Sequence, residues 1–383
     1  MRRRDALSTV CKWMGGSALG VWGGTAWSQA SGVGENTVVL GQSAPFSGAA
    51  EQLGVQFHLG AQMHFDAVNQ KGGIHGRRIE LKRLDDGYEP ERCVANTRQF
   101  VSQGVFALFG YIGTPTSLAA LPLATEAKTP FFAPFTGADS LREPHNRYAV
   151  HVRASYGDET AAIVKQIAAV GVKRIAVFHQ NDAYGKAGLD GVTRALKALN
   201  LEPVATSVVE RNSVDVAQAA QAILAQKPEA IVQISAYKSC AAFIRAARKA
   251  GYVGNFYNVS FVGTQALLDE LGRDARGVIV SQVMPFPYAP VSALSGQYLQ
   301  ALKSQPTATP NYSGMEGFVA ARVFTEALSR AGRNLTRDAF LNAIQGMRNL
   351  DLGGFVLDFG PGKNTGSRFV DLTLLTEDGR VRR

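Results

Sequence analysis

The sequence lacks the features that usually identify an enzyme or a membrane protein. Beyond the first thirty of its 383 residues it has no run of roughly 18 apolar residues, so we expect no membrane-spanning helix there. Phosphate-loop, dinucleotide-binding, zinc-protease and nucleophile-elbow motifs are all missing. We therefore predict no catalysis, no cofactor and no metal. A dispersed catalytic set in a cleft remains a distant alternative.

Strong charge and cysteine are also scarce. Forty Lys and Arg residues against 31 Asp and Glu give a formal net charge of +9, and the cations are scattered among acids without a basic run. This pattern excludes nucleic acid as an expected partner. Of three cysteines, Cys93 and Cys240 lie beyond the first thirty residues, in different halves of the chain. Two buried thiols and one disulfide both remain open.

The first thirty residues have the pattern of a removable export signal. Cations, among them Arg3 and Arg4, precede a Gly-rich, mildly apolar stretch that ends in the small-residue site Ser28-Gln29-Ala30. The paired arginines fit a loose twin-arginine signal, and the Sec route stays open beside it. Cleavage removes four cations and one anion, which lowers the net charge to +6. We expect a periplasmic protein that begins near Ser31.

The remaining chain alternates short apolar runs with helical stretches, which predicts an α/β fold with parallel sheets. About 350 residues exceed one usual core, so two domains are expected. The predicted strands are Thr37–Gln42, Arg78–Leu84, Val105–Phe109 and Pro130–Ala133, then Arg174–Phe178, Val204–Val208, Ala230–Ile234, Phe256–Val259 and Val278–Ser281. These two series predict two doubly wound lobes.

The first predicted helix has an apolar stripe at helical spacing, formed by Phe57, Ala61, Phe65 and Val68. This stripe is expected to face the core. His58 and His64 lie on the same helix, and no third ligand is placed nearby, so we interpret both as structural. Pro90 opens the next helix, where its missing N–H costs nothing.

The lobes are expected to be joined by three crossings, the first near His151 to Ser155. The N-terminal lobe then comprises residues 31–151 and 284–350, and the C-terminal lobe 152–283 and 351–383. Late helices are expected at 293–303, 314–331 and 336–347. The alternating segment Gly354–Phe359 is predicted to form a closing hairpin with Phe369–Leu375.

Several motifs resemble one known family. They are the run Gly41–Gly48, then Gly54, Asp66–Arg77 and Asp85-Asp86; the pattern Gly110, Thr114, Ser117, Pro122 and Pro130; the turn Asn181–Gly185; and Gly314–Gly317. Together they resemble the leucine/isoleucine/valine-binding protein family, the type I periplasmic solute-binding components of ABC importers. The resemblance covers nearly the whole mature chain. It implies a two-lobed protein that closes on a small molecule.

The strongest candidate site is the helix start at Thr114 to Ser117, just after the third strand. Ligands of open parallel sheets bind beyond the carboxyl ends of the strands. A helix N-terminus offers free amides and partial positive charge, so with the hydroxyls of Thr114, Thr116 and Ser117 it can hold a carboxylate. The resemblance implies the same use. A simple helix cap is the alternative.

Further candidates surround this anchor. Phe135 and Thr136 follow the fourth strand and should lie beside it, although Thr136 would also serve as a turn hydroxyl. The resemblance implies that Leu53 presses on the ligand side chain, and a core leucine is the alternative. Tyr184 and Tyr237 are expected to close over the ligand from the other lobe, because each has an apolar face and a hydroxyl.

One position departs from the family pattern. Amino-acid binders of the family place an acid after the fourth strand of the C-terminal lobe to hold the ligand ammonium, and Ser260 stands there. The turn at Asn181 also departs, and we interpret Asn181 as taking the place of the family's acid. A buried ammonium without a carboxylate is costly, so an α-amino acid requires another acid, such as Asp182. A small organic acid, an amide or an aromatic carboxylate competes.

The expected function is capture of such a solute by hinge closure and delivery to an ABC permease in the inner membrane. The protein is expected to act as a monomer. A soluble ligand-sensing subunit for a receptor or sensor kinase is the alternative, because the same two-lobed fold serves signalling.

Overall fold

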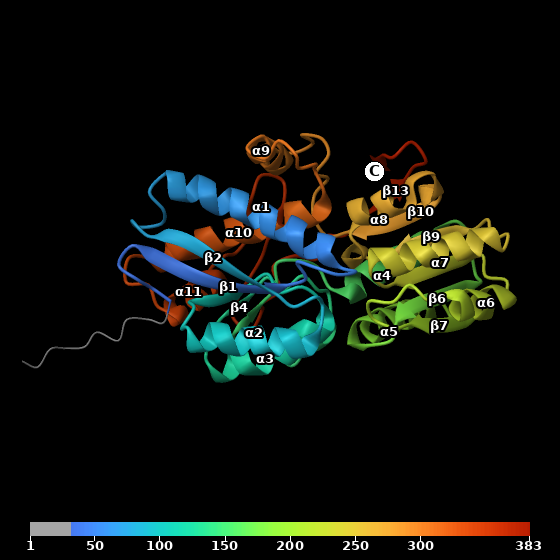
Figure 1. Cartoon of the computed structure of the whole chain (residues 1–383), viewed down its shortest axis with the longest axis horizontal. Coiled ribbons are helices and arrows are strands. Elements are labelled where there is room, and N and C mark those ends of the chain that lie inside the picture. Colours follow the sequence, from blue (N-terminus) through green and yellow to red (C-terminus); the bar gives the residue numbers. More distant parts are fainter. Residues whose placement is uncertain (1–31) are drawn as a thin grey trace, which may run out of the picture.

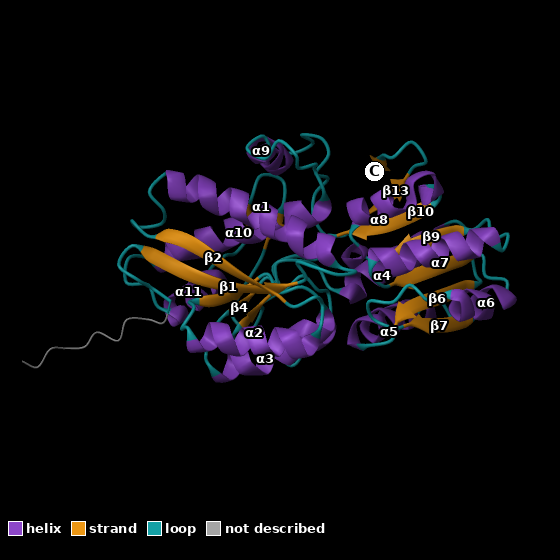
Figure 2. Ribbon diagram, viewed as in Figure 1, coloured by secondary structure: helices purple, strands orange, loops and turns teal. Residues whose placement is uncertain are grey.

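The computed structural model describes residues 32–383, so the export signal predicted at residues 1–30 lies outside the described part. Two lobes lie side by side along the long axis of the molecule (Figure 1). In each lobe, helices cover both faces of a sheet (Figure 2). Within residues 32–383, no helix combines the length and apolar character needed to cross a bilayer. The predicted fold class, two doubly wound α/β lobes, is confirmed.

The N-terminal lobe is built on a five-stranded parallel sheet with the order β2-β1-β3-β4-β5. Its strands are β1 (Thr37–Ala44), β2 (Arg78–Asp85), β3 (Ala107–Phe109), β4 (Phe131–Phe132) and β5 (Ala149–Val150). The register of β1 and β2 runs from Thr37 opposite Arg78 to Ala44 opposite Asp85. The carboxyl ends of all five strands therefore face the same edge, toward the other lobe (Figure 2).

Six helices belong to this lobe: α1 (Glu51–Gln70), α2 (Pro90–Ser102), α3 (Thr114–Glu126), α9 (Ala293–Leu302), α10 (Tyr312–Ala331) and α11 (Arg337–Gln345). Helices α2 and α3 cover one face of the sheet, and α1 with α10 the other (Figure 1). Pro90 is the first residue of α2, as predicted. The side chain of Asn311 caps α10 by accepting from the amide of Gly314 at 2.7 Å.

Helix α1 has the core-facing stripe that the sequence predicts. Phe57, Ala61 and Phe65 are fully buried, and Val68 is partly buried against the same core. Phe65 packs edge-on against Phe109 of β3, with ring centroids 5.4 Å apart. Because these rings lock the helix to the sheet, the loops at the carboxyl ends of the strands are held on a rigid base.

Both histidines of α1 have structural partners. His58 lies 2.7 Å from the amide oxygen of Gln42, and His64 lies 2.9 Å from the hydroxyl of Thr325. Burial lowers the pKa of His58 to about 4 and that of His64 to about 3, so both are neutral at pH 7. These contacts support the structural interpretation.

The C-terminal lobe contains a seven-stranded sheet with the order β14-β13-β10-β9-β8-β6-β7. Its strands are β6 (Ile175–Gln180), β7 (Ala205–Val209), β8 (Ala230–Ile234), β9 (Asn255–Asn258), β10 (Val278–Gln282), β13 (Asp371–Leu375) and β14 (Val381–Arg382). Its helices are α4 (Tyr156–Ala169), α5 (Ala183–Lys197), α6 (Ala217–Ala225), α7 (Tyr237–Lys249) and α8 (Thr264–Leu271). Strands β6 to β10 are parallel, whereas β13 and β14 are antiparallel additions.

All nine predicted strands are present, with ends within two residues of the prediction, and β5 is an additional short strand. The predicted closing hairpin is wrong. Val356 and Leu357 form β12, which pairs with β11 (Leu350–Asp351), whereas β13 pairs with β10. Alternation of apolar residues identifies a strand with one buried face but not its partner. The edge of β10 offers five residues for pairing, and β12 contains only two.

Three segments connect the lobes, between β5 and α4, between β10 and α9, and between residues 365 and 371. The lobe boundaries expected at residues 151 and 284 remain a proposal. We propose moving the last boundary from 351 to about residue 367, because this segment is hydrogen-bonded to the N-terminal lobe. The amide of Phe359 donates to the carbonyl of Met347, and the amide of Gly366 donates to that of His151. The amide of Asp358 donates to the carbonyl of Gly366 within the segment.

Glycines allow α1 and α10 to cross closely, which generates a stability prediction. A Cβ on Gly317 would lie 1.9 Å from the carbonyl oxygen of Phe57, whereas a Cβ on Gly296 in α9 would have 3.9 Å to its nearest neighbour. Gly317→Ala should lower the free energy of unfolding by about 1–3 kcal/mol, measured by urea denaturation. Gly296→Ala should raise the free energy of unfolding by about 0.5 kcal/mol, because alanine loses less backbone entropy than glycine when the chain folds. Equal effects of the two changes would contradict this account.

Candidate ligand-binding site between the lobes

The site is built around the first turn of α3. Gly113, the N-cap residue, has φ 99°, and no side chain caps the helix. The hydroxyl of Thr114 lies 2.6 Å from that of Thr136. The Ser117 hydroxyl is buried and has no hydrogen-bond partner among the described residues. Since buried polar groups are normally paired, this hydroxyl is available to a group that comes from outside.

The structure places Phe135 and Thr136 beside this turn, through backbone pairing of two loops. The amide of Phe135 donates to the carbonyl of Tyr111 at 2.7 Å, and the amide of Gly113 donates to the carbonyl of Phe135 at 3.2 Å. Thr116 differs from its neighbours, because its hydroxyl donates to the carbonyl of Gly113 at 3.1 Å and to that of Ile112. Thr114, Ser117 and Thr136 are thus brought together, and Thr116 is turned toward the backbone.

Aromatic rings from both lobes meet opposite the anchor. Phe261 of the C-terminal lobe lies between Tyr184, Phe135 and Tyr88, with ring centroids 4.6, 5.7 and 5.8 Å away. The ring of Tyr88 also presses on the start of α3, because a Cβ on Gly113 would lie 2.2 Å from it. The hydroxyl of Tyr184 is buried without a partner in the described chain. Tyr88 and Phe261 were not predicted.

Leu53 and Tyr237 lie at a second contact between the lobes. A Cβ on Gly263 of the C-terminal lobe would lie 2.5 Å from Cδ2 of Leu53. The amide of Gln52, at the start of α1, lies 3.5 Å from the hydroxyl of Tyr237. Both predicted residues are buried where the lobes touch. Their contact with a ligand remains a prediction.

Ser260 takes part in an ion cluster, which we call the central ion cluster, of Arg153, Glu159 and Glu316. Its amide donates to Oε2 of Glu159 at 2.7 Å, and its hydroxyl donates to Oε1 at 3.1 Å and contacts the guanidinium of Arg153. Arg153 pairs with Glu159 at 3.1 Å and with Glu316 at 3.4 Å. An acid from α4 is therefore adjacent to the position where the family pattern places its own.

The central ion cluster is almost completely buried, with 1 %, 0 % and 5 % exposure for Arg153, Glu159 and Glu316. Burial alone would lower the pKa of Arg153, but the two carboxylates outweigh it and hold that pKa above its usual value. Burial raises the pKa of Glu316 to about 7, against the opposing attraction of Arg153. The guanidinium also lies over the ring of Phe135, 4.9 Å from its centroid.

The turn before α5 uses Asn181 and Asp182 differently. Asp182 and not Asn181 is the cap, because Asp182 accepts from the amides of Tyr184 and Gly185 at 2.9 and 3.4 Å. The side chain of Asn181 donates instead to Glu210 at 2.6 Å. The second oxygen of Asp182 accepts from Gln180 at 2.6 Å and lies 3.5 Å from Arg211. Both carboxylate oxygens of Asp182 therefore have partners within the C-terminal lobe.

Hydrogen bonds hold the lobes together on the same side. The amide of Gln180 donates to the hydroxyl of Tyr88 at 3.2 Å. Arg211 and Asn212 each contact the carboxylate of Glu89 at 2.8 Å. Since the partners come from different lobes, these bonds must break when the lobes separate.

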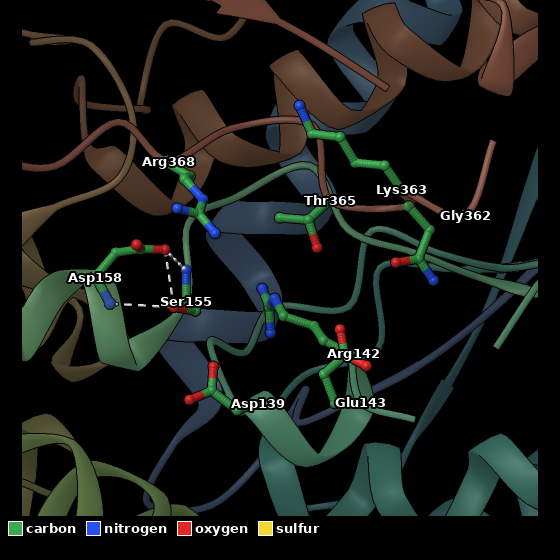
Figure 3. Close-up of a pocket in the computed structure, with 10 residues that line it drawn as sticks. Asp139, Arg142, Glu143, Ser155, Asp158, Gly362, Lys363, Thr365 and Arg368 are labelled. Atoms are coloured by element: carbon green, nitrogen blue, oxygen red, sulfur yellow. Dashed lines mark hydrogen bonds between the residues drawn. The ribbon is translucent and has the colours of Figure 1, made fainter. Parts of the chain in front are cut away.

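A pocket of about 250 Å³ lies at the crossings (Figure 3), and its lining contains none of the predicted site residues, although Arg142 in the lining donates to the carbonyl of Thr136 at 3.4 Å. It is lined by Asp139, Arg142, Glu143, Ser155, Asp158, Gly362, Lys363, Asn364, Thr365 and Arg368. Ser155 and Asp158 form the capping box that begins α4, because the amide of each residue donates to the side chain of the other at 3.1 Å (Figure 3). The lining contains three acidic and three basic side chains, so its formal charge is zero and it favours neither an anionic nor a cationic ligand.

The structure shows the oxidation state of the two described cysteines. Cys93 and Cys240 are buried free thiols, so the disulfide alternative is wrong. Burial raises the pKa of both, which keeps them protonated and unreactive. Among residues 32–383, no group of three or more His, Cys, Asp or Glu side chains is arranged to hold a metal.

Sequence reasoning missed Arg153, Glu159 and Glu316, although two of them carry a signal. Arg153 stands between Val152 and Ala154 in the segment predicted to cross between the lobes, and Glu316 interrupts an apolar, Gly-rich helix start. Isolated charges in apolar surroundings are usually paired when buried. Their partners could not be found from sequence, because Arg153 and Glu316 are 163 residues apart.

Comparison with known proteins decides the family. Residues 37–379 match the periplasmic binding protein family. The chain belongs to this family. An amino acid binding protein of Pseudomonas aeruginosa is 28% identical over 245 residues, which cover 63% of this chain and 64% of that protein, less than two thirds of its length.

Solved structures agree with the family. A substrate-binding periplasmic protein of Ralstonia solanacearum is 31% identical with a TM-score of 0.85, covering 90% of this chain and 99% of its own. A fatty acid ABC transporter substrate-binding protein of Thermomonospora curvata has the same TM-score at 21% identity, covering 92% of each chain. The latter likeness shows the fold alone. The family consists of substrate-binding proteins.

The central ion cluster generates a stability prediction for this binding protein. Arg153→Met should lower the free energy of unfolding at pH 8 by about 3–5 kcal/mol, because two buried carboxylates lose their cation. Arg194→Met is the matched control: Arg194 is 64% exposed and pairs with Asp139 at 3.0 Å, so its loss should cost about 0–1 kcal/mol. Urea denaturation measures both. Similar costs would show that the cluster does not act as a buried unit.

Proposed function

We propose that this binding protein captures a small amino acid, or a related small carboxylate or amide, between its lobes and delivers it to an ABC permease of the inner membrane. The export signal expected at residues 1–30 supports a periplasmic location. The family match supports binding of a small molecule without catalysis.

One observation carries this proposal: the buried, unpartnered hydroxyl of Ser117 at the uncapped start of α3, beside the hydroxyls of Thr114 and Thr136. A carboxylate or amide oxygen placed there would accept from Ser117 and from free amides of the helix, with the helix dipole in its favour. The neighbouring rings of Tyr88, Phe135 and Phe261 would cover the apolar part of the ligand.

Entry of the ligand requires the lobes to separate, because the proposed residues are buried in the described arrangement. The ligand first meets the anchor on the N-terminal lobe. Contacts from Tyr184 and Tyr237 of the C-terminal lobe then favour the closed state. The apparent affinity therefore depends on both the anchor contacts and the closed population.

A thermal-shift screen of amino acids, amides and organic acids should identify the ligand, since a solute at about 100 times its Kd adds about 2.7 kcal/mol to the stability. Thr114→Ala combined with Ser117→Ala should then weaken its binding at least about tenfold, because about 1.4 kcal/mol or more of anchor contacts are lost. Isothermal titration calorimetry measures this change.

The control for this variant removes two exposed hydroxyls elsewhere, by Ser102→Ala with Thr206→Ala, and should leave the affinity unchanged. Thermal unfolding of both variants without ligand separates loss of binding from loss of folding. An unaltered affinity in a folded Thr114→Ala, Ser117→Ala variant would remove the anchor from the proposal.

A further inference from the structure

We propose that closure of the two lobes takes up a proton at Glu316, so that a lower pH strengthens ligand capture. The inference rests on the proposed function in one respect, because the effect on ligand capture requires that the lobes close around a ligand. The closure itself can be measured without any ligand.

The central ion cluster connects the two lobes. Glu159 belongs to α4 of the C-terminal lobe, Glu316 belongs to α10 of the N-terminal lobe, and Arg153 lies in the crossing between them. When the lobes are in contact, two carboxylates share one buried guanidinium. The three side chains of the cluster then carry one negative charge in excess while they are almost completely buried, which is unfavourable unless one carboxylate becomes neutral.

Glu316 is the carboxylate that takes the proton. The carboxylate of Glu159 accepts four hydrogen bonds, from Arg153, from the amide and the hydroxyl of Ser260, and from the hydroxyl of Ser281 at 2.6 Å. Glu316 accepts only from Arg153, at 3.4 Å, among the described residues. Burial raises the pKa of Glu316 to about 7, within the range that a periplasmic protein meets.

The other groups around Glu316 do not replace it as the titrating group. Arg142 is a second buried cation, and its attraction lowers the pKa of Glu316. Helix α1 presents Phe57 and Gly60 to the start of α10, and Tyr298 of α9, whose pKa burial raises to about 12, stays neutral. His64 of α1 contacts Thr325 and Phe318 of α10, and burial lowers its pKa to about 3, so it is neutral in this range.

Asp86 is the other described carboxyl whose pKa burial brings into this range, to about 6. It accepts from the hydroxyl of Ser43 at 2.7 Å and from the amide of Tyr88 at 2.9 Å. Both partners belong to the N-terminal lobe, so separation of the lobes leaves these bonds in place. Asp86 therefore contributes little to the pH dependence of closure.

Opening admits water to the crossing and returns the pKa of Glu316 toward its ordinary value of 4.5. The closed state then binds more protons than the open state between these two values. Closure is favoured as the pH falls below 7, and this advantage is lost as the pH rises through 7. From pH 8 to pH 6 the closed-to-open ratio, and with it the affinity, should rise about tenfold.

Small-angle X-ray scattering of the ligand-free protein at pH 8, 7 and 6 tests this directly. The radius of gyration should decrease toward pH 6 as the closed population grows. Glu316→Gln, which is neutral at every pH, should be as compact at pH 8 as the wild type is at pH 6. Glu326→Gln removes a partly exposed acid on the same helix, paired with Arg330, and is the matched control that should follow the wild type.

A radius that does not change with pH in the wild type, or a Glu316→Gln variant that keeps the wild-type pH dependence, overturns the inference. If Glu316→Gln does not fold, the wild-type profile alone decides. Calorimetry with L-leucine and with 4-methylpentanoate, neither of which titrates between pH 6 and 8, adds the affinity. If neither these solutes nor the wider screen bind while the scattering changes as expected, the proposed function fails and the proton coupling stands.

Discussion

A single buried guanidinium is the constraint on which the arrangement of the lobes depends. Arg153 lies in the segment between β5 and α4 and pairs with one carboxylate from each lobe. Because the guanidinium is buried when the lobes are in contact, its charge must be paired there, and Glu159 provides that pairing whether or not Glu316 carries a proton. The amide and the hydroxyl of Ser260 both donate to Glu159, which extends this constraint to the loop that carries Phe261. Ion pairing and aromatic packing are therefore coupled in one region.

The fold was largely predictable because its signals are local. Apolar runs of five or so residues, the stripe of α1 and the cap signals at Pro90 each depend on neighbours in the sequence. The pairing of β13 with β10 is different, since it joins segments about ninety residues apart and is decided by which strand edge remains open. No local pattern specifies that choice. Strand β5 was not found for a different reason, because two residues are too few to show a periodic pattern.

The candidate site was predictable on one lobe and much less on the other. Thr114, Ser117 and Thr136 follow strands whose carboxyl ends meet, so topology alone brings them together. Contacts between the lobes depend on the angle between two rigid bodies, which the sequence does not encode locally. Tyr88 and Phe261 meet across that boundary for this reason. The position of Ser260 was identified, but the acid beside it comes from α4 and required the three-dimensional structure.

The antiparallel strand β13 has a consequence for the solubility of the chain. It covers the full length of β10, from Val278 opposite Leu375 to Gln282 opposite Asp371. Without the last thirteen residues, β10 would present five unsatisfied positions and an apolar face at the border of a large sheet, which is the template for intermolecular strand addition. Strand β13, which follows the third crossing, thus protects the edge of β10 from pairing with another molecule, and this effect does not depend on hinge motion.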